Sequence, residues 1–556
     1  MAEQDDFAQQ SHAVRHQART DRVVFGVTAA LTVVFVAWGV LSTGTLDAVA
    51  AGGLSWLVTN VGWGFVLAAT GFVVFALWLA GSRFGAIPLG GDDEDPEFRT
   101  ISWIAMMFSA GMGIGLMFFG VSEPLAHFVE PPPGAAQPMS DEAVRVAMAT
   151  TLFHWTLHPW AIYAVVGLAI AYCSFRRGRR QLISAVFTPL IGKRRAEGPL
   201  GKLIDILALF ATLFGSAASL GLGTLQIRSG MQAAGWIGAV GNMLLVGIIV
   251  VLTICFIASA VSGIARGIQW LSNINMVLAA LLAIFVFVVG PTVFALDLLP
   301  TALGSYVSDF GDMASRSGAT GGESMISWLS EWTIFYWAWW ISWTPFVGMF
   351  IARISRGRTI RQFVGGVILV PSVVSVIWFA ILGGSAIKLQ DTGTDVYASG
   401  GEEAQTFDML GALPLSLITT VLVMILVAIF FVSGADAASV VMGTLSQRGS
   451  IEPKRWVVVF WGAATGAVAA IMLLLGGEDA LSGIQNLTFL ASAPFAVVMV
   501  LLCVALLKDL RSDPLMRRGE KGAQVLEQAV ISGTERHGED FQLEVGPPEE
   551  SEGDDR

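Results

Sequence analysis

Charged residues are scarce in this chain. They make up 13% of its 556 residues, whereas soluble domains usually carry about 25%. Hydrophobic residues reach 54%, and the mean hydropathy is +0.68. This balance indicates that most of the chain faces lipid or other apolar helices. It leaves no room for a soluble catalytic domain and restricts the function to transport, channel activity or membrane sensing.

Cysteine is also rare. The three cysteines, Cys173, Cys255 and Cys503, are far apart in apolar segments, so we expect small core residues and neither a disulfide nor a metal site. No nucleophile–base pair and no cluster of metal ligands is evident, since His154 and His158 have no third ligand nearby in the sequence. We therefore expect no enzyme, no cofactor and no nucleic-acid partner.

Long apolar runs are abundant. Because a membrane span needs roughly 20 apolar residues, the chain is expected to be an all-α membrane protein with twelve spans. The expected spans are approximately 23–41, 56–81, 101–120, 143–173, 203–227, 235–259, 270–296, 328–352, 363–388, 413–434, 455–475 and 484–507.

Basic residues gather in alternate loops, which predicts the orientation. Arginine and lysine follow the fourth and eighth spans, whereas the loops after spans one, three, seven, nine and eleven are nearly free of both and carry acids: Glu123, Asp309, Glu402, Glu403, Glu478 and Asp479. Positive charge stays on the cytoplasmic side. We therefore expect both termini in the cytoplasm, with an N-terminal segment 1–22, a membrane domain 23–508 and a tail 509–556. The tail ends in an acidic stretch that we expect to be disordered.

The third span contains Gly111-Met112-Gly113-Ile114-Gly115. Each glycine costs a helix about 1 kcal/mol relative to alanine. One explanation is a broken helix whose exposed backbone groups bind an ion or a carboxylate. Close packing between helices would also explain the glycines.

Aromatic side chains gather in two spans. In the fourth, Trp155, Trp160 and Tyr163 surround Pro159, and quaternary ammonium binds to such aromatic faces because it cannot donate a hydrogen bond. An aromatic belt at the membrane interface is the alternative for that span alone. The eighth span has five tryptophans between Trp332 and Trp343. They cover every face of the helix, so an aromatic belt at the membrane interface cannot account for all of them. A permeation path lined by aromatic side chains accounts for those that face the interior.

These blocks resemble the betaine/choline/carnitine transporters over about residues 20–510. The segment Trp332–Arg361, ending in Ala352-Arg353-Ile354-Ser355-Arg356-Gly357-Arg358, matches the signature of that family. The glycine stretch, Phe153-His154-Trp155 and Gln269-Trp270-Leu271-Ser272-Asn273 support it. The resemblance implies a LeuT-like fold. Two leading helices precede two inverted five-helix repeats (about 101–296 and 328–507), the third span is broken, and the assembly is usually a homotrimer.

The resemblance also implies the binding residues. Trp155, Trp160, Tyr163 and Trp340 would form the central cage, flanked by Phe335, Trp339 and Trp343. Backbone near Met112 and Gly113 would meet the substrate carboxylate. One sodium site would comprise Thr212 and Ser216 with Phe346 close by, and a second would comprise carbonyls of Ser109, Met112 and Phe430 with the hydroxyl of Ser433. Oxygen ligands are what a small hard cation prefers.

Three positions bear on substrate and coupling. Proton-coupled choline members of the family carry an aspartate where this chain has Gly115, which favours a zwitterion here over a net cation. Sodium-independent carnitine exchangers carry an arginine at the position of Gln269, which favours ion-coupled import. The family's sodium-coupled members usually have Thr-Ser where this chain has Ser433-Gly434, so one hydroxyl of the second sodium site is missing.

Together these features predict a sodium-coupled symporter of the bacterial inner membrane. It would import glycine betaine or a similar quaternary-ammonium solute by alternating access, with membrane lipid around it. The alternatives are a proton-coupled or exchange carrier of choline, carnitine or ectoine, and a membrane osmosensor that binds solute without transport.

Overall fold

A computed structural model shows a chain built from helices. It describes residues 20–111, 113–238, 241, 243–262, 265–397, 401–476, 480–538 and 541–543. The first half contains α2 (Arg22–Leu41), α3 (Thr43–Gly81), η1 (Arg83–Ala86), α4 (Thr100–Gly111), α5 (Ile114–Val129), α6 (Asp141–Trp155), α7 (Leu157–Ala171), η2 (Tyr172–Arg176), α8 (Ile183–Val186), α9 (Thr188–Ile191), α10 (Lys193–Ala196), α11 (Pro199–Ala233) and α12 (Met243–Ser262).

The second half is equally helical. It contains α13 (Ala265–Val289), α14 (Thr292–Ser308), α15 (Phe310–Ser315), α16 (Gly318–Leu329), η3 (Ser330–Ile334), α17 (Phe335–Arg353), α18 (Ile360–Asp391), α19 (Glu402–Gly411), α20 (Ser416–Ser446), α21 (Arg455–Leu475), α22 (Ala480–Arg511) and α23 (Pro514–His537). Within the described ranges the only β-pairing is an isolated bridge between Pro88 and Thr359. The expectation of an all-α fold is confirmed.

Eight described helices are long and apolar enough to cross a membrane. A ninth span is possible if the pair Asn273–Val289 and Thr292–Ser308, bent by 108°, counts as one. The chain is therefore a multi-pass membrane protein. The tryptophan-rich helix α17 is not among the eight, although it is 19 residues long. The count of twelve spans and the arrangement as inverted repeats stay predictions.

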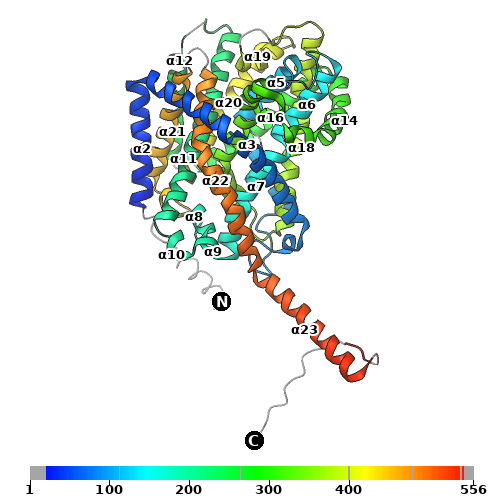
Figure 1. The fold of residues 1–556 in the computed structure, drawn as a ribbon. Coiled ribbons are helices and arrows are strands. Elements are labelled where there is room, and N and C mark those ends of the chain that lie inside the picture. The colour runs from blue at the N-terminus through cyan, green and yellow to red at the C-terminus, as the bar shows by residue number, and fades with distance from the viewer. Residues whose placement is uncertain are drawn as a thin grey trace. The chain divides into compact units, whose positions relative to one another are not determined.

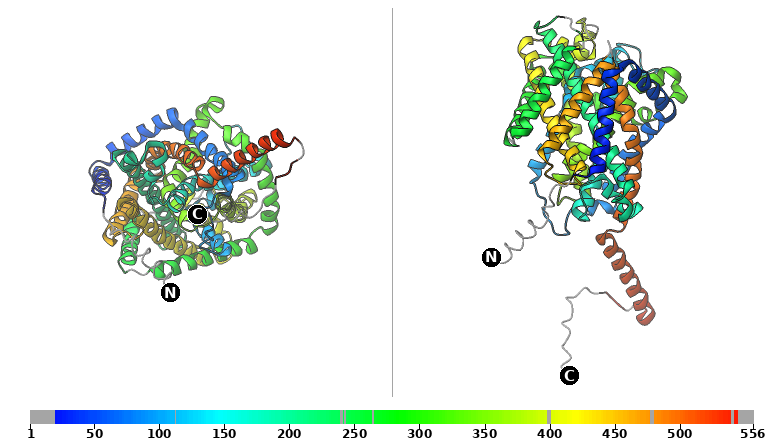
Figure 2. Two further views of the ribbon diagram at one scale, coloured as in Figure 1. Left: turned by 90° about the horizontal axis from the view of Figure 1, so that it is seen from below. Right: turned by 90° about the vertical axis from the view of Figure 1, so that its left-hand side faces the viewer.

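The helices of residues 20–505 pack side by side in a bundle (Figures 1 and 2). Helix α2 lies at its outer edge (Figure 1), and only 22% of its apolar window is buried inside the protein. Helices α6 and α7 are at the opposite extreme, because 94% of the window in Asp141–Arg176 is buried. The residues that sequence analysis singled out in the fourth span thus lie in the interior, away from the surface that lipid would cover.

The predicted break in the third span is present. Helix α4 ends at Gly111 and α5 begins at Ile114, with Gly113 in a fully extended conformation (φ −166°, ψ −177°) between them. An extended residue cannot continue the helical hydrogen-bond ladder, so the first N–H groups of α5 have no partner within the helix. Helix α5 then continues to Val129, nine residues beyond the expected end of the span.

The fourth span is also broken, slightly before its proline. Helix α6 ends at Trp155, Thr156 has non-helical angles (φ −115°, ψ −103°), and α7 begins at Leu157. Pro159 explains the position, because proline has no N–H to give the carbonyl four residues earlier and its ring clashes with that carbonyl. The break places Trp155 at the end of one helix and Trp160 at the start of the next.

The arginines of the signature segment brace a neighbouring loop. The Arg358 guanidinium donates to the carbonyl of Phe98 (2.9 Å) and lies over the ring of Trp103 (4.1 Å to its centroid). Arg356 pairs with Glu94 (2.5 Å). Glu94 therefore has a structural role, because its ion pair helps to hold segment 82–99 against residues 353–361.

Asp21 joins the start of α2 to two other segments. Its carboxylate accepts hydrogen bonds from the N–H groups of Val23 (3.0 Å) and Val24 (3.2 Å) and lies near Lys202 (3.5 Å) and Arg448 (3.4 Å). Burial acts to raise the pKa of Asp21, but these hydrogen bonds and positive charges outweigh it and lower the pKa. A carboxyl with a lowered pKa stabilises the fold above its ordinary pKa and loses that contribution as the pH falls through the lowered value.

Replacing Asp21 should therefore destabilise the protein at neutral pH. We expect Asp21→Ala to reduce the free energy of unfolding by about 1 kcal/mol, the usual cost of losing a helix N-cap. Thermal unfolding of the detergent-solubilised protein measures this. The matched control is Asp93→Ala, because Asp93 is exposed. Equal unfolding temperatures for the two variants would show that the cap and its ion pairs contribute nothing.

Two further expectations concern the tail and the cysteines. The tail contains helix α23 (Pro514–His537), and its acidic end from residue 544, which was expected to be disordered, lies outside the described residues. Cys173 is buried as expected and Cys503 is half-buried, but Cys255 is exposed. The expectation of a core position for Cys255 was wrong because an apolar helix such as α12 can turn its side chains towards lipid.

Candidate functional site

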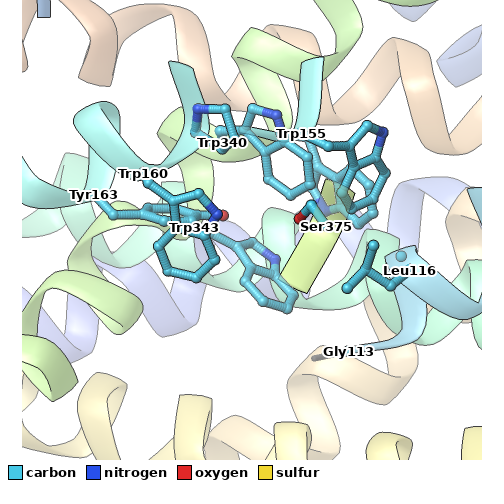
Figure 3. A pocket seen from close by; sticks show the side chains of 11 residues that line it. Gly113, Leu116, Trp155, Trp160, Tyr163, Trp340, Trp343 and Ser375 are labelled. Carbon is cyan, nitrogen blue, oxygen red and sulfur yellow. The ribbon is translucent and has the colours of Figure 1, made fainter. Parts of the chain in front are cut away.

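A cavity lies where the two helix breaks meet α17. The space between its walls, including the part that is open to solvent, is about 480 Å³. Figure 3 shows its walls, with the rings of Trp160, Tyr163 and Trp343 on one side and Trp155 and Trp340 above them. The lining residues are Gly113, Gly115, Leu116, Trp155, Pro159, Trp160, Tyr163, Trp339, Trp340, Trp343 and Ser375.

Five helices supply these residues, and the local sequence explains why they converge. The break before α5 brings Gly113 and Gly115 to the cavity, and the break at Thr156 lets α6 and α7 contribute aromatic rings from two directions. Helix α17 contributes three tryptophans, and α18 contributes Ser375. Discontinuous helices are the usual way in which membrane transporters expose backbone groups to a site at mid-membrane.

The polar edges of the cavity tryptophans are hydrogen-bonded to the protein. The Trp155 indole N–H donates to Glu123 (2.5 Å), and that of Trp340 donates to the carbonyl of His154 (3.1 Å). The Trp339 indole N–H donates to Ser219 (3.2 Å), and that of Trp343 donates to the carbonyl of Gly215 (2.9 Å). A buried indole N–H needs a partner. Since these partners lie outside the cavity, the rings of these four tryptophans present only carbon surface to a ligand.

The rings also fix one another. Trp155 meets Trp340 edge to face (centroids 4.9 Å apart, 77° between planes), and Trp339 stacks on Trp340 (4.7 Å, 16°). Trp160 packs against Tyr163 at 5.4 Å and 75°. Such pairs are worth roughly 0.5–1.5 kcal/mol each beyond the area they bury. The cage is therefore held in shape before any ligand enters.

Most of the predicted substrate-site residues come together here. Trp155, Trp160, Tyr163, Trp340, Trp339, Trp343 and Gly113 all line the cavity. Phe335 does not line it but stacks behind Trp339 (5.7 Å, 14°). Met112 lies outside the described residues.

Sequence analysis missed three lining residues, Leu116, Pro159 and Ser375. Leu116 and Pro159 adjoin motifs that were recognised, so the positions of the two helix breaks are enough to explain why these residues line the cavity. Ser375 is buried on α18 in an apolar stretch with no aromatic or charged residue beside it. Only the three-dimensional packing of α18 against the cage reveals it.

Glu123 is the main correction to the sequence analysis. It was expected in an outward-facing loop after the third span, but α5 includes it and its side chain is fully buried. The carboxylate accepts hydrogen bonds from Trp155 Nε1 (2.5 Å) and the Tyr336 hydroxyl (2.6 Å), and its other oxygen lies 2.6 Å from His154 Nδ1. The sequence was misleading because an acid followed by proline resembles a loop, whereas here Pro124 lies inside a helix and three side chains provide polar partners for the acid.

The two histidines of the fourth span have different surroundings. His154 bonds to Glu123 and, through Nε2, to Thr333 (3.0 Å). His158 stacks on Trp337 (4.6 Å, 22°) and contacts Thr70 through Nε2 (3.3 Å). The ligand atoms of Glu123, His127 and His154 do lie within 4.8 Å of one another. His154 is thus grouped with Glu123 and His127 of α5. Its spacing of four residues from His158 is incidental.

The residues expected to bind sodium lie on the helices around the cavity. Thr212 and Ser216 are buried on α11, and their neighbour Gly215 receives the Trp343 indole of α17. Phe346 packs on Trp343 (5.7 Å, 72°). For the second site, the Ser433 hydroxyl bonds to the carbonyls of Ile429 (2.8 Å) and Phe430 (3.3 Å) on α20. Ser109 is on α4, but its side chain, like Met112, lies outside the described set.

Comparison with known proteins decides the family. A model of the betaine/carnitine/choline family transporters matches residues 23–515. The chain belongs to this family. The match covers both helix breaks and every residue that lines the cavity, so the cavity lies inside a transporter domain.

Individual members are similar along most of their length. The chain is 46% identical to the betaine/ectoine transporter LcoP of Corynebacterium glutamicum over 542 residues, covering 97% of this chain and 86% of that protein. It is 42% identical to the glycine betaine transporter OpuD of Bacillus subtilis over 508 residues, 91% and 97% of the two chains. Glycine betaine transporter 1 of Vibrio parahaemolyticus is 39% identical over 497 residues, 88% and 94%. These relatives are transporters and not enzymes.

Proposed function

We propose that this protein imports glycine betaine or a similar quaternary-ammonium compatible solute by sodium symport. The observation that carries the proposal is the cavity of Trp155, Trp160, Tyr163 and Trp340, whose indole N–H groups at Trp155 and Trp340 point away from it. A trimethylammonium group offers no hydrogen-bond donor but is attracted to aromatic faces. Two relatives that match nearly the whole chain are named for betaine transport.

The other end of a betaine would lie at the break between α4 and α5. Gly113 and Gly115 line the cavity at the start of α5, where unpaired N–H groups and the helix dipole favour an anion. A Cβ at Gly113 would meet nothing within 4 Å, so the backbone there is open to a ligand. A zwitterion with a cationic and an anionic end therefore fits this cavity, which has aromatic rings on one side and the N-terminus of α5 on the other.

The coupling ion in this proposal is sodium, at the two sites that the family resemblance implies. Sodium entry would release roughly 2.3 kcal/mol per charge per 100 mV of membrane potential, besides its concentration gradient. The transport cycle would be alternating access about the cavity. We further propose that both termini lie in the cytoplasm of the bacterial inner membrane, as the loop charges indicate, and that the protein assembles as a homotrimer in lipid.

Uptake into liposomes tests the proposal. We expect the purified protein to accumulate labelled glycine betaine when sodium is outside, and uptake to fall at least about tenfold when potassium replaces sodium, because the gradient supplies more than the 1.4 kcal/mol that a factor of ten requires. Uptake that ignores sodium would contradict the coupling. Failure to accumulate any onium compound would contradict the transport proposal as a whole and favour a sensor.

Ectoine is the second candidate substrate, because LcoP is named for betaine and ectoine. Excess unlabelled ectoine in the same assay distinguishes the two. Inhibition weaker than that by unlabelled betaine would fit a cage selective for a trimethylammonium head.

The missing hydroxyl at Gly434 gives a specific prediction on coupling. A Cβ there would meet nothing within 4 Å, so a serine side chain has room next to Ser433. We expect Gly434→Ser to lower the sodium concentration for half-maximal betaine uptake several-fold, since one further oxygen ligand completes the second sodium site. Gly434→Ala is the matched control, with the same Cβ and no hydroxyl. Identical sodium dependence in the two variants would place the second site elsewhere.

A further inference from the structure

Glu123 is an acidic side chain of α5 with no lysine or arginine among the ion-pair partners that the described residues provide. It is fully buried. Its charged or chargeable partners are His154, whose Nδ1 is 2.6 Å from Oε1, and His127, whose Nε2 is 3.6 Å away. A buried carboxylate without a cationic partner is costly. Such a residue inside a membrane is a functional candidate.

Two hydrogen-bond donors meet one oxygen of this carboxyl group. An indole N–H can only donate, so Trp155 requires Oε2 to accept its hydrogen bond (2.5 Å). Tyr336 shares the same oxygen (2.6 Å), and His154 reaches the other (2.6 Å). Two donors therefore share Oε2, and an ionised carboxylate has the acceptor capacity for both.

Glu123 acts on the cage through two aromatic side chains. Trp155 lines the cavity, and Glu123 itself does not. Tyr336 stacks on Trp340 (centroids 5.9 Å apart, 16° between planes) and meets Trp155 edge to face (5.5 Å, 71°). One carboxylate therefore holds a cavity ring directly and the central Trp340 through Tyr336. His154, which also contacts the carboxylate (2.6 Å), accepts the Trp340 indole N–H at its own carbonyl (3.1 Å).

We propose that Glu123 is the positioning residue that tunes the aromatic cage for a positively charged head group. This rests on the proposed function of the cavity. Its charge polarises the indole N–H of Trp155 and makes the ring face that the ligand meets more electron-rich, which strengthens cation–π attraction. The same charge adds a negative potential from behind the ring, in a region of low dielectric. The hydrogen bonds hold Trp155 and Tyr336 at the angles that the cage needs.

This role revises the argument drawn from Gly115. The absence of an acid at that position suggested a site without a buried negative charge. The structure places an acid one layer further out, behind Trp155. The cage thus combines attraction for an onium head group with an uncharged inner wall, and the helix N-terminus at Gly113 remains free for the carboxylate.

The test compares Glu123→Gln with the wild-type full-length protein in detergent. Glutamine keeps the shape and one acceptor oxygen but removes the charge. We expect the dissociation constant for glycine betaine, measured by tryptophan fluorescence, to rise at least about tenfold, the factor expected for a Coulomb interaction across one ring at an effective dielectric near 20. The unfolding temperature should not fall, because a buried amide is less costly to desolvate than a buried carboxylate.

A weaker affinity together with an unchanged unfolding temperature distinguishes a positioning role of Glu123 from a purely structural one. If Glu123 only supported the fold, affinity and unfolding temperature would fall together, and that outcome would overturn the proposal. An unchanged dissociation constant would overturn it as well. Glu142→Gln is the matched control, since Glu142 is on α6 with Trp155 but half-exposed and paired with Arg145; it should leave the dissociation constant unchanged. If the wild type itself binds no betaine, the proposed function fails instead.

Discussion

Replacing Trp340 by alanine should greatly weaken betaine binding. Trp340 lines the cavity and is the ring around which the others are arranged, with Trp155, Trp339 and Tyr336 all packed on it. The substitution removes one cation–π contact, worth about 2 kcal/mol when dry, and leaves three rings without their neighbour. We expect the dissociation constant to rise by more than about thirtyfold. Tryptophan fluorescence titration measures it.

The control for this variant is Trp63→Ala. Trp63 is 66% exposed on α3, so its loss removes the same chromophore without touching the cage. It should bind betaine as the wild type does. Both variants should elute as folded protein on size exclusion. A Trp340→Ala protein that binds betaine with unchanged affinity would refute the assignment of the cage.

Gly115→Ala should damage the site from the opposite side. A Cβ at Gly115 would lie 2.7 Å from Cη2 of Trp339 and 2.9 Å from Cη2 of Trp155. Both rings are buried and held by hydrogen bonds, so neither can move aside without disturbing the cage. Overpacking of this kind costs about 1–3 kcal/mol. We expect betaine affinity to fall about tenfold or more, measured by the same titration.

A glycine in open space provides the comparison. A Cβ at Gly71 on α3 would meet nothing within 4 Å, so Gly71→Ala should bind betaine normally and unfold at the same or a slightly higher temperature. If Gly115→Ala binds as well as Gly71→Ala does, the rings of Trp155 and Trp339 are free to shift, and the cage is less rigid than the hydrogen bonds imply.

Several features of the site were readable in the sequence because local chemistry determines them. Three glycines within five residues allowed either a broken helix or close helix packing, and the family resemblance favoured the break between α4 and α5. Five tryptophans on every face of one helix predicted that some would face the interior. The family resemblance then selected the cage residues, all four of which line one cavity.

The features that were missed depend on contacts between distant segments. Glu123 reads as a loop residue until Tyr336, more than 200 positions later, supplies a donor to it. Ser375 has no local signal, and it reaches the cavity only because α18 packs beside the cage. The hydrogen bond from Arg358 to Phe98 likewise joins two distant loops, the one before α4 and the one between α17 and α18. Periodicity and composition carry no information about such pairs.

Sodium coupling stays a prediction for a similar reason. Thr212 and Ser216 are one helical turn apart and buried on α11, which the sequence already implied. The second site would combine residues of α4 and α20, and one of its hydroxyls is replaced by Gly434. Whether residues of α4 and α20 converge on one ion depends on tertiary packing. Comparing the sodium dependence of Gly434→Ser with that of Gly434→Ala tests it.

The most direct test of the cage is to locate the onium head group itself. Arsenobetaine replaces the ammonium nitrogen of glycine betaine by arsenic, so an anomalous difference map of crystals soaked with it marks that one atom. The account predicts a single peak enclosed by the rings of Trp155, Trp160, Tyr163 and Trp340, with the carboxylate towards Gly113. A peak outside these rings, with the cavity empty, would contradict it.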